Sequence, residues 1–384
     1  MKKPFADLNR VSDLIREFTP NWFTVTMGTG IVALIIAESP LASELFWQMG
    51  AGLWLLNIIL FVAFLSLYAL RWIYYPVEAK QIFQHPNMSL FLGAIPMGLA
   101  TIINGFLKFG IVQMGDIAVQ IAGLLWYVDV ALAVLIAWAV PFFMYSRQKH
   151  EFKSMTAVWL LPIVACEVAA SSGGLLLAHQ EPTQQSVMIL LGSYMLWGIS
   201  VLPAFGILSI LMLRLALHQL PEKEMAISSW LALGPIGTGA LALLLLGHQA
   251  PQVLAVIDQY SLGLFLQQVG IMGALILLGF AVWWFGIALL TTLSHAKKQL
   301  PFNLGWWGLT FPIGVFTLAI FNLAAALELQ FLYAVAYALG GVLVMLWILV
   351  ATKTAAGFYH GNLIFSPCLK QYLQKQQIAK ATEK

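Results

Sequence analysis

The chain has 384 residues, of which 61% are hydrophobic and only 9% are charged, with a formal net charge of +3. A soluble protein normally carries about 25% charged residues, so this composition excludes a single water-soluble domain. The seven histidines and two cysteines are scattered singly, and no phosphate-binding loop or nucleophile-elbow motif occurs. The sequence therefore predicts an all-α protein of the lipid bilayer with no metal, no cofactor and no nucleic-acid partner.

Residues 1–18 precede the first apolar run and mix charged with apolar side chains. Leu8, Val11, Ile15 and Phe18 fall near helical spacing, which favours an amphipathic helix lying on the membrane surface. A solvated tail fits the same residues equally well. In either case we expect a cytoplasmic N-terminal segment.

Ten apolar runs follow, each long enough to cross roughly 30 Å of hydrocarbon. They cover residues 19–38, 50–70, 88–107, 118–146, 155–178, 187–213, 228–247, 261–293, 303–326 and 330–352. The short connections predict that successive helices are antiparallel neighbours. We expect one ten-helix transmembrane domain over 19–352, followed by a cytoplasmic tail over 353–384.

The basic residues predict the orientation of these helices. Lysines and arginines gather in the N-terminal segment, in every second connection and in the tail, among them Lys2, Lys3, Lys297, Lys298 and Lys384. Lys108 alone is expected on the other side, with Glu38, Glu44, Asp116, Glu181, Asp258 and Glu328. Because cytoplasmic loops carry the excess of Lys and Arg, we expect both termini on the cytoplasmic side of an inner membrane.

An internal repeat marks the odd-numbered spans. An aromatic residue is followed five positions later by Pro-Met-Gly or Pro-Ile-Gly, and degenerate copies complete a series that begins at Trp22, Phe91, Trp159, Trp230 and Trp307. The copies start 68 to 77 residues apart, which is the length of one helical hairpin. The repeat predicts five hairpins related by quasi-fivefold rotation around a central pore.

Proline and glycine in the repeat suggest which helices line that pore. A proline inside a helix removes a backbone hydrogen bond, so kinks are expected at mid-membrane, where only protein or water makes them tolerable. The pore-lining and kink candidates are Gly28, Gly30, Pro96, Gly98, Pro162, Pro235, Gly237, Pro312 and Gly314. The alternative for the glycines is close packing between helices.

Few polar side chains lie deep in the predicted spans. Glu167 is a candidate for proton exchange with the pathway, although a neutral acid hydrogen-bonded between helices fits as well, and Asp129 reads more simply as a structural partner. Thr101 and Asn104, with Asn322 on the ninth span, are candidates to contact a solute. No Lys, Arg or His falls in the predicted pathway, so an anion would rely on hydroxyls, backbone N–H groups and helix ends.

Several strings on the odd-numbered spans match a known family. They are Asn21-Trp22-Phe23, Ile95-Pro96-Met97-Gly98-Leu99-Ala100-Thr101, Leu233-Gly234-Pro235-Ile236-Gly237 and Trp306-Trp307-Gly308-Leu309-Thr310-Phe311-Pro312. From about residue 19 to 352 the chain resembles the tellurite-resistance/dicarboxylate transporter family. That family includes the fungal malate permease and sulfite pump, which these strings resemble most, and is related to the plant slow anion channels.

The resemblance implies a structure and an activity. It implies five hairpins, a homotrimer with one pore per subunit, and a phenylalanine on the ninth helix that occludes the pore, which by position is Phe311, with Phe316 as second choice. It implies transport of small anions, with C4-dicarboxylates such as malate ranked first and efflux of sulfite or another small inorganic anion second. Glu167 departs from the family pattern, which leaves open a passive channel or a proton-coupled carrier.

Two other classes of function fit less well. An intramembrane enzyme would need converging catalytic groups, and Asp129 with Glu167 gives thin support for one in the absence of a metal-ligand set. A sensor is expected to append a soluble output domain, for which the short tails leave no room. We therefore expect a transporter and not an enzyme.

Overall fold

The computed structural model describes residues 5, 8, 10, 12–38, 43–296 and 300–382. Within these ranges the chain is helical and contains no β-strand, which confirms the all-α prediction. Val11 of the proposed N-terminal helix lies outside the described residues. So do five lysines used to predict the orientation: Lys2, Lys3, Lys297, Lys298 and Lys384.

Nine helical segments of the described chain are long and apolar enough to cross a membrane. They are Glu44–Tyr74, Met88–Met114, Asp116–Ser146, Ala157–Leu177, Gln184–His218, Ala226–Ala255, Tyr260–Ala296, Leu304–Leu327 and Gln330–His360. The first predicted span, 19–38, corresponds to a shorter apolar helix, Pro20–Ile36. The chain is thus a multi-pass membrane protein, and the count of ten spans stays a prediction.

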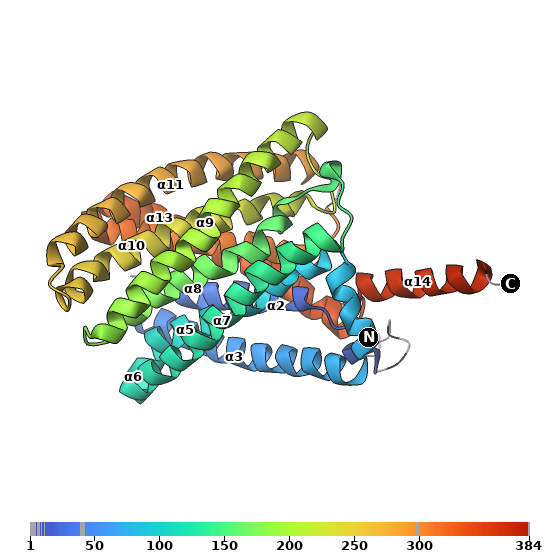
Figure 1. The fold of residues 1–384 in the computed structure, drawn as a ribbon, viewed down its shortest axis with the longest axis horizontal. Coiled ribbons are helices and arrows are strands. Elements are labelled where there is room, and N and C mark those ends of the chain that lie inside the picture. Colours follow the sequence, from blue (N-terminus) through green and yellow to red (C-terminus); the bar gives the residue numbers. More distant parts are fainter. Residues whose placement is uncertain are drawn as a thin grey trace.

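Long helices form the outside of the bundle (Figure 1). These outer helices are α3 (Ser43–Tyr74), α7 (Asp116–Ser146), α9 (Gln184–His218), α11 (Tyr260–Ala296) and α13 (Gln330–His360). In the most apolar stretch of each, only 22% to 33% of the residues are buried within the subunit. Their apolar side chains therefore face away from the interior of the bundle, as expected for contact with lipid.

A second set of helices occupies the interior. These inner helices are α2 (Phe23–Ile36), α5 (Ala94–Gly105), α8 (Leu161–Leu177), α10 (Leu233–Ala255) and α12 (Phe311–Leu327). They contact one another in a closed ring, in the order α2, α5, α8, α10, α12 and back to α2. Four of them, α5, α8, α10 and α12, lie within segments long enough to span a membrane. In the most apolar stretch of each of these segments, 78% to 94% of the residues are buried. The quasi-fivefold symmetry itself stays a prediction.

Tryptophans on the outer helices fasten them to the inner ones. Each outer helix donates one indole N–H inward: Trp54 to Ile102 O (3.1 Å), Trp126 to Ala169 O (2.8 Å), Trp197 to Gly239 O (3.0 Å), Trp284 to Ser229 O (2.9 Å) and Trp347 to Thr29 Oγ1 (3.2 Å). The indole buries a large apolar ring and still satisfies its one donor. The same device thus recurs in all five outer helices.

Every inner helix begins with a short 3₁₀ segment. These segments are η1 (Pro20–Trp22), η3 (Met88–Gly93), η6 (Ala157–Leu160), η7 (Ala226–Ala232) and η8 (Leu304–Leu309), and each holds the aromatic residue of the sequence repeat. The prolines at 96, 162, 235 and 312 then fall at the second or third residue of the α-helix. The prediction of prolines inside a continuous helix is wrong here, because a first-turn residue has no helical partner for its N–H and proline fits without a kink.

Shorter elements complete the described chain. They are α1 (Asp13–Arg16), α4 (Pro76–Ala79), η2 (Lys80–Gln84), the π-helical η4 (Phe106–Gly110), α6 (Ile111–Met114), η5 (Phe152–Ser154) and α14 (Pro367–Thr382). Figure 1 shows α14 extending away from the bundle at the end where the N-terminus lies. Phe18 is fully buried and contacts the rings of Trp22 and Phe64, so it anchors the N-terminal segment to the bundle. An amphipathic helix over 1–18 stays a prediction.

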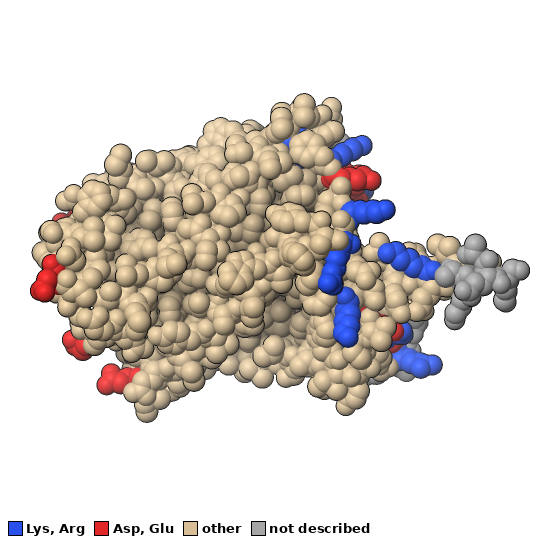
Figure 2. Space-filling model, in the orientation of Figure 1, with Lys and Arg blue, Asp and Glu red and all other residues tan. Residues whose placement is uncertain are grey.

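Charge separates the two ends of the molecule. In Figure 2 lysine and arginine gather at one end, and aspartate and glutamate predominate at the other. We call them the basic end, which carries the connections 75–87, 147–156 and 219–225, and the acidic end, which carries 178–183 and 256–259. Lys108, the lysine predicted on the acidic side, pairs with Glu38 at 2.5 Å.

Candidate functional site

The 3₁₀ segments converge on a cavity of about 450 Å³ that opens at the basic end. All five inner helices contribute residues from their beginnings: Met27, Met97, Val164, Gly234 and Phe311. The lining takes no residue from farther along these helices. The cavity is therefore a vestibule that reaches the ring of inner helices and stops at their beginnings.

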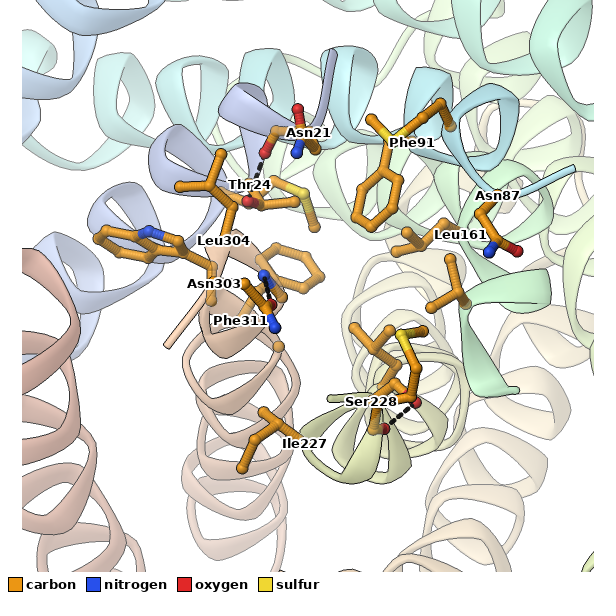
Figure 3. Close-up of a pocket in the computed structure, with 18 of the residues that line it drawn as sticks. Asn21, Thr24, Asn87, Phe91, Leu161, Ile227, Ser228, Asn303, Leu304 and Phe311 are labelled. Atoms are coloured by element: carbon orange, nitrogen blue, oxygen red, sulfur yellow. Dashed lines mark hydrogen bonds between the residues drawn. The ribbon is translucent and has the colours of Figure 1, made fainter. Parts of the chain in front are cut away.

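Phe311 occupies the deep end of this vestibule. It is the first residue of α12 and only 3% exposed, and Figure 3 shows its ring inside the cavity, between Thr24 and Ile227. Phe316, the second gate candidate, is equally buried but does not line the cavity; its ring lies 6.2 Å from that of Phe285 on α11. Of the two, only Phe311 lies where a side chain would obstruct passage from the vestibule.

Neutral polar groups lie among the mostly apolar residues of the vestibule wall. Asn21, Thr24, Asn87, Ser228 and Asn303 come from four different segments around its wall (Figure 3). The two hydroxyls donate to nearby carbonyls, Thr24 to Asn21 O and Ser228 to Met225 O, both at 2.6 Å. Because both hydroxyl protons are donated to carbonyls, the side-chain amides of Asn21, Asn87 and Asn303 are the groups of this set that can donate weakly to a solute.

His85 adds an imidazole to the wall. Its Nδ1 accepts hydrogen bonds from the backbone N–H groups of Asn87 (3.2 Å) and Met88 (3.1 Å), so the proton of the neutral ring is on Nε2. Burial lowers the pKa of His85 below its ordinary value. His85 is therefore a neutral donor near pH 7, and Glu224 is the one carboxylate among the described lining residues, which include neither lysine nor arginine.

The C-terminal segment covers one side of the vestibule. Asn362, Leu363, Phe365 and Pro367 belong to the lining although they lie far from the inner helices in sequence. No sequence signal pointed to this contact, because the segment reads as part of a polar tail.

A buried arginine holds that segment in place. Arg71, at the basic end of α3 and 1% exposed, donates to Phe18 O and to Ser366 Oγ (3.1 Å). The backbone N–H of Ser366 in turn donates to Glu17 Oε2 at 2.7 Å. Burial raises the pKa of Glu17, opposed by the Ser366 hydrogen bond and the Arg71 charge. The two ends of the chain are thereby joined beside the vestibule.

The predicted pore-lining glycines face neighbouring helices instead. A Cβ added at Gly237 would lie 2.9 Å from the backbone N of Phe316. A Cβ at each of the other four would likewise meet a side chain of another helix segment: Thr310 for Gly28, Thr101 for Gly30, Thr26 for Gly98 and Ile31 for Gly314. None of these glycines lines the vestibule. The contacts favour the alternative that sequence left open, close packing between helices, because a hydrogen side chain lets the backbones approach.

The remaining polar candidates are also placed between helices. Thr101 donates to Gly98 O (2.8 Å) and accepts from Asn57 Nδ2 (3.0 Å), and Asn322 donates to Leu318 O (2.9 Å). Asn104 is partly buried, and its Oδ1 has no partner among the described residues. Asp129 and Glu167 are fully buried. The structure therefore brings only Phe311 and Pro312, of all the predicted site residues, to the vestibule wall.

Comparison with known proteins places the chain among anion transporters. The family model described as voltage-dependent anion channel matches residues 17–355. A sulfite efflux pump of Arthroderma benhamiae is 35% identical over 342 residues, which cover 88% of this chain and 90% of the pump. A sulfite efflux pump of Arthroderma otae is 37% identical over 307 residues (79% and 81%), and a malic acid transport protein of Schizosaccharomyces pombe is 22% identical over 371 residues (95% and 83%).

Proposed function

The chain belongs to the voltage-dependent anion channel family and transports small anions, and on that premise we propose that its substrate is sulfite, exported through the ring of inner helices. The sequence alone ranked malate first. The sulfite pumps are 35% and 37% identical to this chain, whereas the malic acid transporter is 22% identical, and this difference supports the reverse order.

One observation carries the route: the vestibule is built from the beginnings of all five inner helices, with Phe311 at its deep end. A solute that enters at the basic end meets neutral amides, hydroxyls and the His85 imidazole before it meets the aromatic ring. Neutral donors bind an anion weakly enough to release it, which favours rapid passage. Phe311 acts as the gate, and its displacement opens the axis toward the acidic end.

The basic end is the cytoplasmic one in this proposal, and both termini are cytoplasmic at an inner membrane. The concentration of lysine and arginine at that end supports the assignment through the positive-inside rule. An anion then leaves the cell down a membrane potential that is negative inside, which agrees with efflux. The apolar exposed surfaces of the outer helices provide the area for assembly as a homotrimer with one pore in each subunit.

Flux from proteoliposomes tests the substrate. Purified protein is reconstituted into vesicles loaded with sulfite, malate, nitrate or chloride, and release is followed with and without an imposed potential. We expect sulfite to leave faster than malate, and more rapidly when the loaded side is negative. Malate release that exceeds sulfite release would restore the order expected from sequence. Sulfite release no faster than from vesicles without protein would remove the proposal.

A further inference from the structure

Glu167 lies off the route described above, where α8, α9 and α10 meet. Its carboxylate approaches Gly239 of α10, where a Cβ would lie 3.7 Å from Oε2. The vestibule lining on α8 ends at Val164 and does not include Glu167. The carboxylate is fully buried, and the Ser200 hydroxyl of α9 is its polar neighbour.

A row of serines on α9 leads to this carboxylate. Ser186, Ser193 and Ser200 are spaced by seven residues, so they lie on one face of the helix, and each is at most 1% exposed. Ser200 lies close to Glu167, and a Cβ at Gly173 of α8 would meet Ser193 Oγ. Ser186 is at the beginning of α9, where its hydroxyl donates to Glu181 O at 3.1 Å. The row thus runs from the acidic end to the middle of the bundle.

Several buried hydroxyls of α8, α9 and α10 lack protein partners. Within the described chain the hydroxyls of Ser172 and Ser193 make no hydrogen bond, and neither does Thr238 on α10, while the Ser200 hydroxyl interacts with the Glu167 carboxylate. Buried polar groups in proteins are almost always paired with protein or with ordered water. Serines that served only to let helices approach would satisfy their hydroxyls on the preceding turn, as Ser171 does with Val168 O (2.8 Å). The orphaned hydroxyls therefore indicate water between α8 and α9.

An ionised carboxylate at this position would be severely disfavoured, because no cation within the described residues pairs with it. Cys166 is the residue before Glu167 in the sequence, and Asp129 of α7 lies near Cys166. The titratable groups on the other elements packed nearby form no hydrogen bond with Glu167; they are Tyr194, Arg214 and His218 of α9, His248 of α10, and Tyr260 and His295 of α11. The neutral, protonated acid is the form that this environment accepts.

We propose that Glu167 is the proton-binding residue of a second, hydrated path that runs between α8 and α9 from the acidic end and is separate from the anion route. A proton taken from water at the acidic end passes along the water and hydroxyls between α8 and α9, which we call the α8–α9 seam. It converts the Glu167 carboxylate to the carboxylic acid, and release reverses the same transfer. The site takes protons and water, and it does not depend on which anion the inner ring carries.

Infrared spectroscopy of the protein in liposomes tests the site without measuring transport. The carbonyl stretch of a protonated carboxylic acid shifts when H₂O is replaced by D₂O. We expect such a band in the wild type, with one component that is lost in Glu167→Gln and retained in Asp129→Asn. A band that persists unchanged in Glu167→Gln would overturn the assignment. Modification by a hydrophobic carbodiimide, mapped to Glu167 by mass spectrometry, gives an independent reading, and its absence would count equally against the site.

The α8–α9 seam is tested by the rate at which the Glu167 proton exchanges for deuterium after transfer to D₂O. Ser193→Ala and Ser200→Ala remove hydroxyls that hold the water, and we expect each to slow deuteration of the Glu167 band by about tenfold or more. Ser209→Ala is the matched control, because this serine is on the same helix but exposed, with its hydroxyl bonded to Phe205 O (2.9 Å). Equal exchange rates in all three variants would rule out the path. Because anion release is not the readout, the proposed sulfite transport stands or fails separately.

Discussion

The inner and outer helices contain the same kinds of residues but use them differently. Most glycines of the inner helices abut a neighbouring helix. The outer helices carry two kinds: Gly263 and Gly270 of α11 also abut α10, whereas a Cβ added to Gly192, Gly206 or Gly279 would meet nothing within 4 Å. Both sets are apolar throughout, since both have apolar surroundings. The difference shows that in a lipid solvent the fit between helices, rather than hydropathy, separates the interior of the bundle from its surface.

Glycine substitution gives the largest expected contrast. Gly237→Ala places a methyl group 2.9 Å from the backbone of Phe316, and such overpacking costs about 1–3 kcal/mol. Gly279→Ala on α11 is the matched control; it meets nothing and gains up to about 1 kcal/mol of helix propensity. Thermal denaturation in detergent should move in opposite directions for the two variants. Equal shifts would mean that the glycines of the inner ring are not close-packed.

The gate is tested by truncating a phenylalanine in each set. Phe311→Ala removes the ring from the deep end of the vestibule, and we expect sulfite release to rise about tenfold, which corresponds to a barrier lower by about 1.4 kcal/mol. Phe265→Ala, on α11 with 59% of the residue exposed, should leave release unchanged. A folded Phe311→Ala protein with wild-type flux would show that the obstruction lies elsewhere on the axis.

Loss of one indole N–H measures how strongly the two sets are joined. Trp197→Phe keeps most of the ring but removes the donor to Gly239 O, with an expected loss of about 0.5–1.5 kcal/mol of stability. Trp138→Phe on α7, where the side chain is 65% exposed, should have almost no effect. Comparison of the two melting temperatures gives the contribution of the hydrogen bond, and identical values would show that the indoles act by packing alone.

The smallest effect concerns His85 at the rim of the inner set. Because its pKa is lowered in the folded protein, the unfolded chain takes up the proton first as pH falls. The contribution of His85 to stability is therefore complete above its ordinary pKa and is lost as pH drops toward the lowered value. His85→Asn retains an acceptor for the backbone N–H groups and does not titrate. Its melting temperature should fall less than that of the wild type between pH 7 and pH 5; equal falls would exclude His85 as the source.

Several features of the fold were predictable from local sequence. Apolar runs of spanning length predicted the helices, and the aromatic and proline repeat located the beginnings of the inner ones, although it was interpreted as a series of kinks. Phe311 was located through a resemblance and lies in the vestibule. The covering of the vestibule by Phe365 and its neighbours had no local signal, because Arg71 and Ser366 are nearly 300 residues apart and meet only in the folded chain.

The sequence by itself determined the class of the protein, because an almost uncharged chain can be stable only in lipid and must satisfy its backbone within helices. It also determined where each repeat begins. Only the tertiary structure decided which way each side chain faces. The Cβ directions of Gly98 and Gly314 and the position of Glu167 depend on the neighbouring helices, and a uniformly apolar helix has no polar stripe from which that direction can be read.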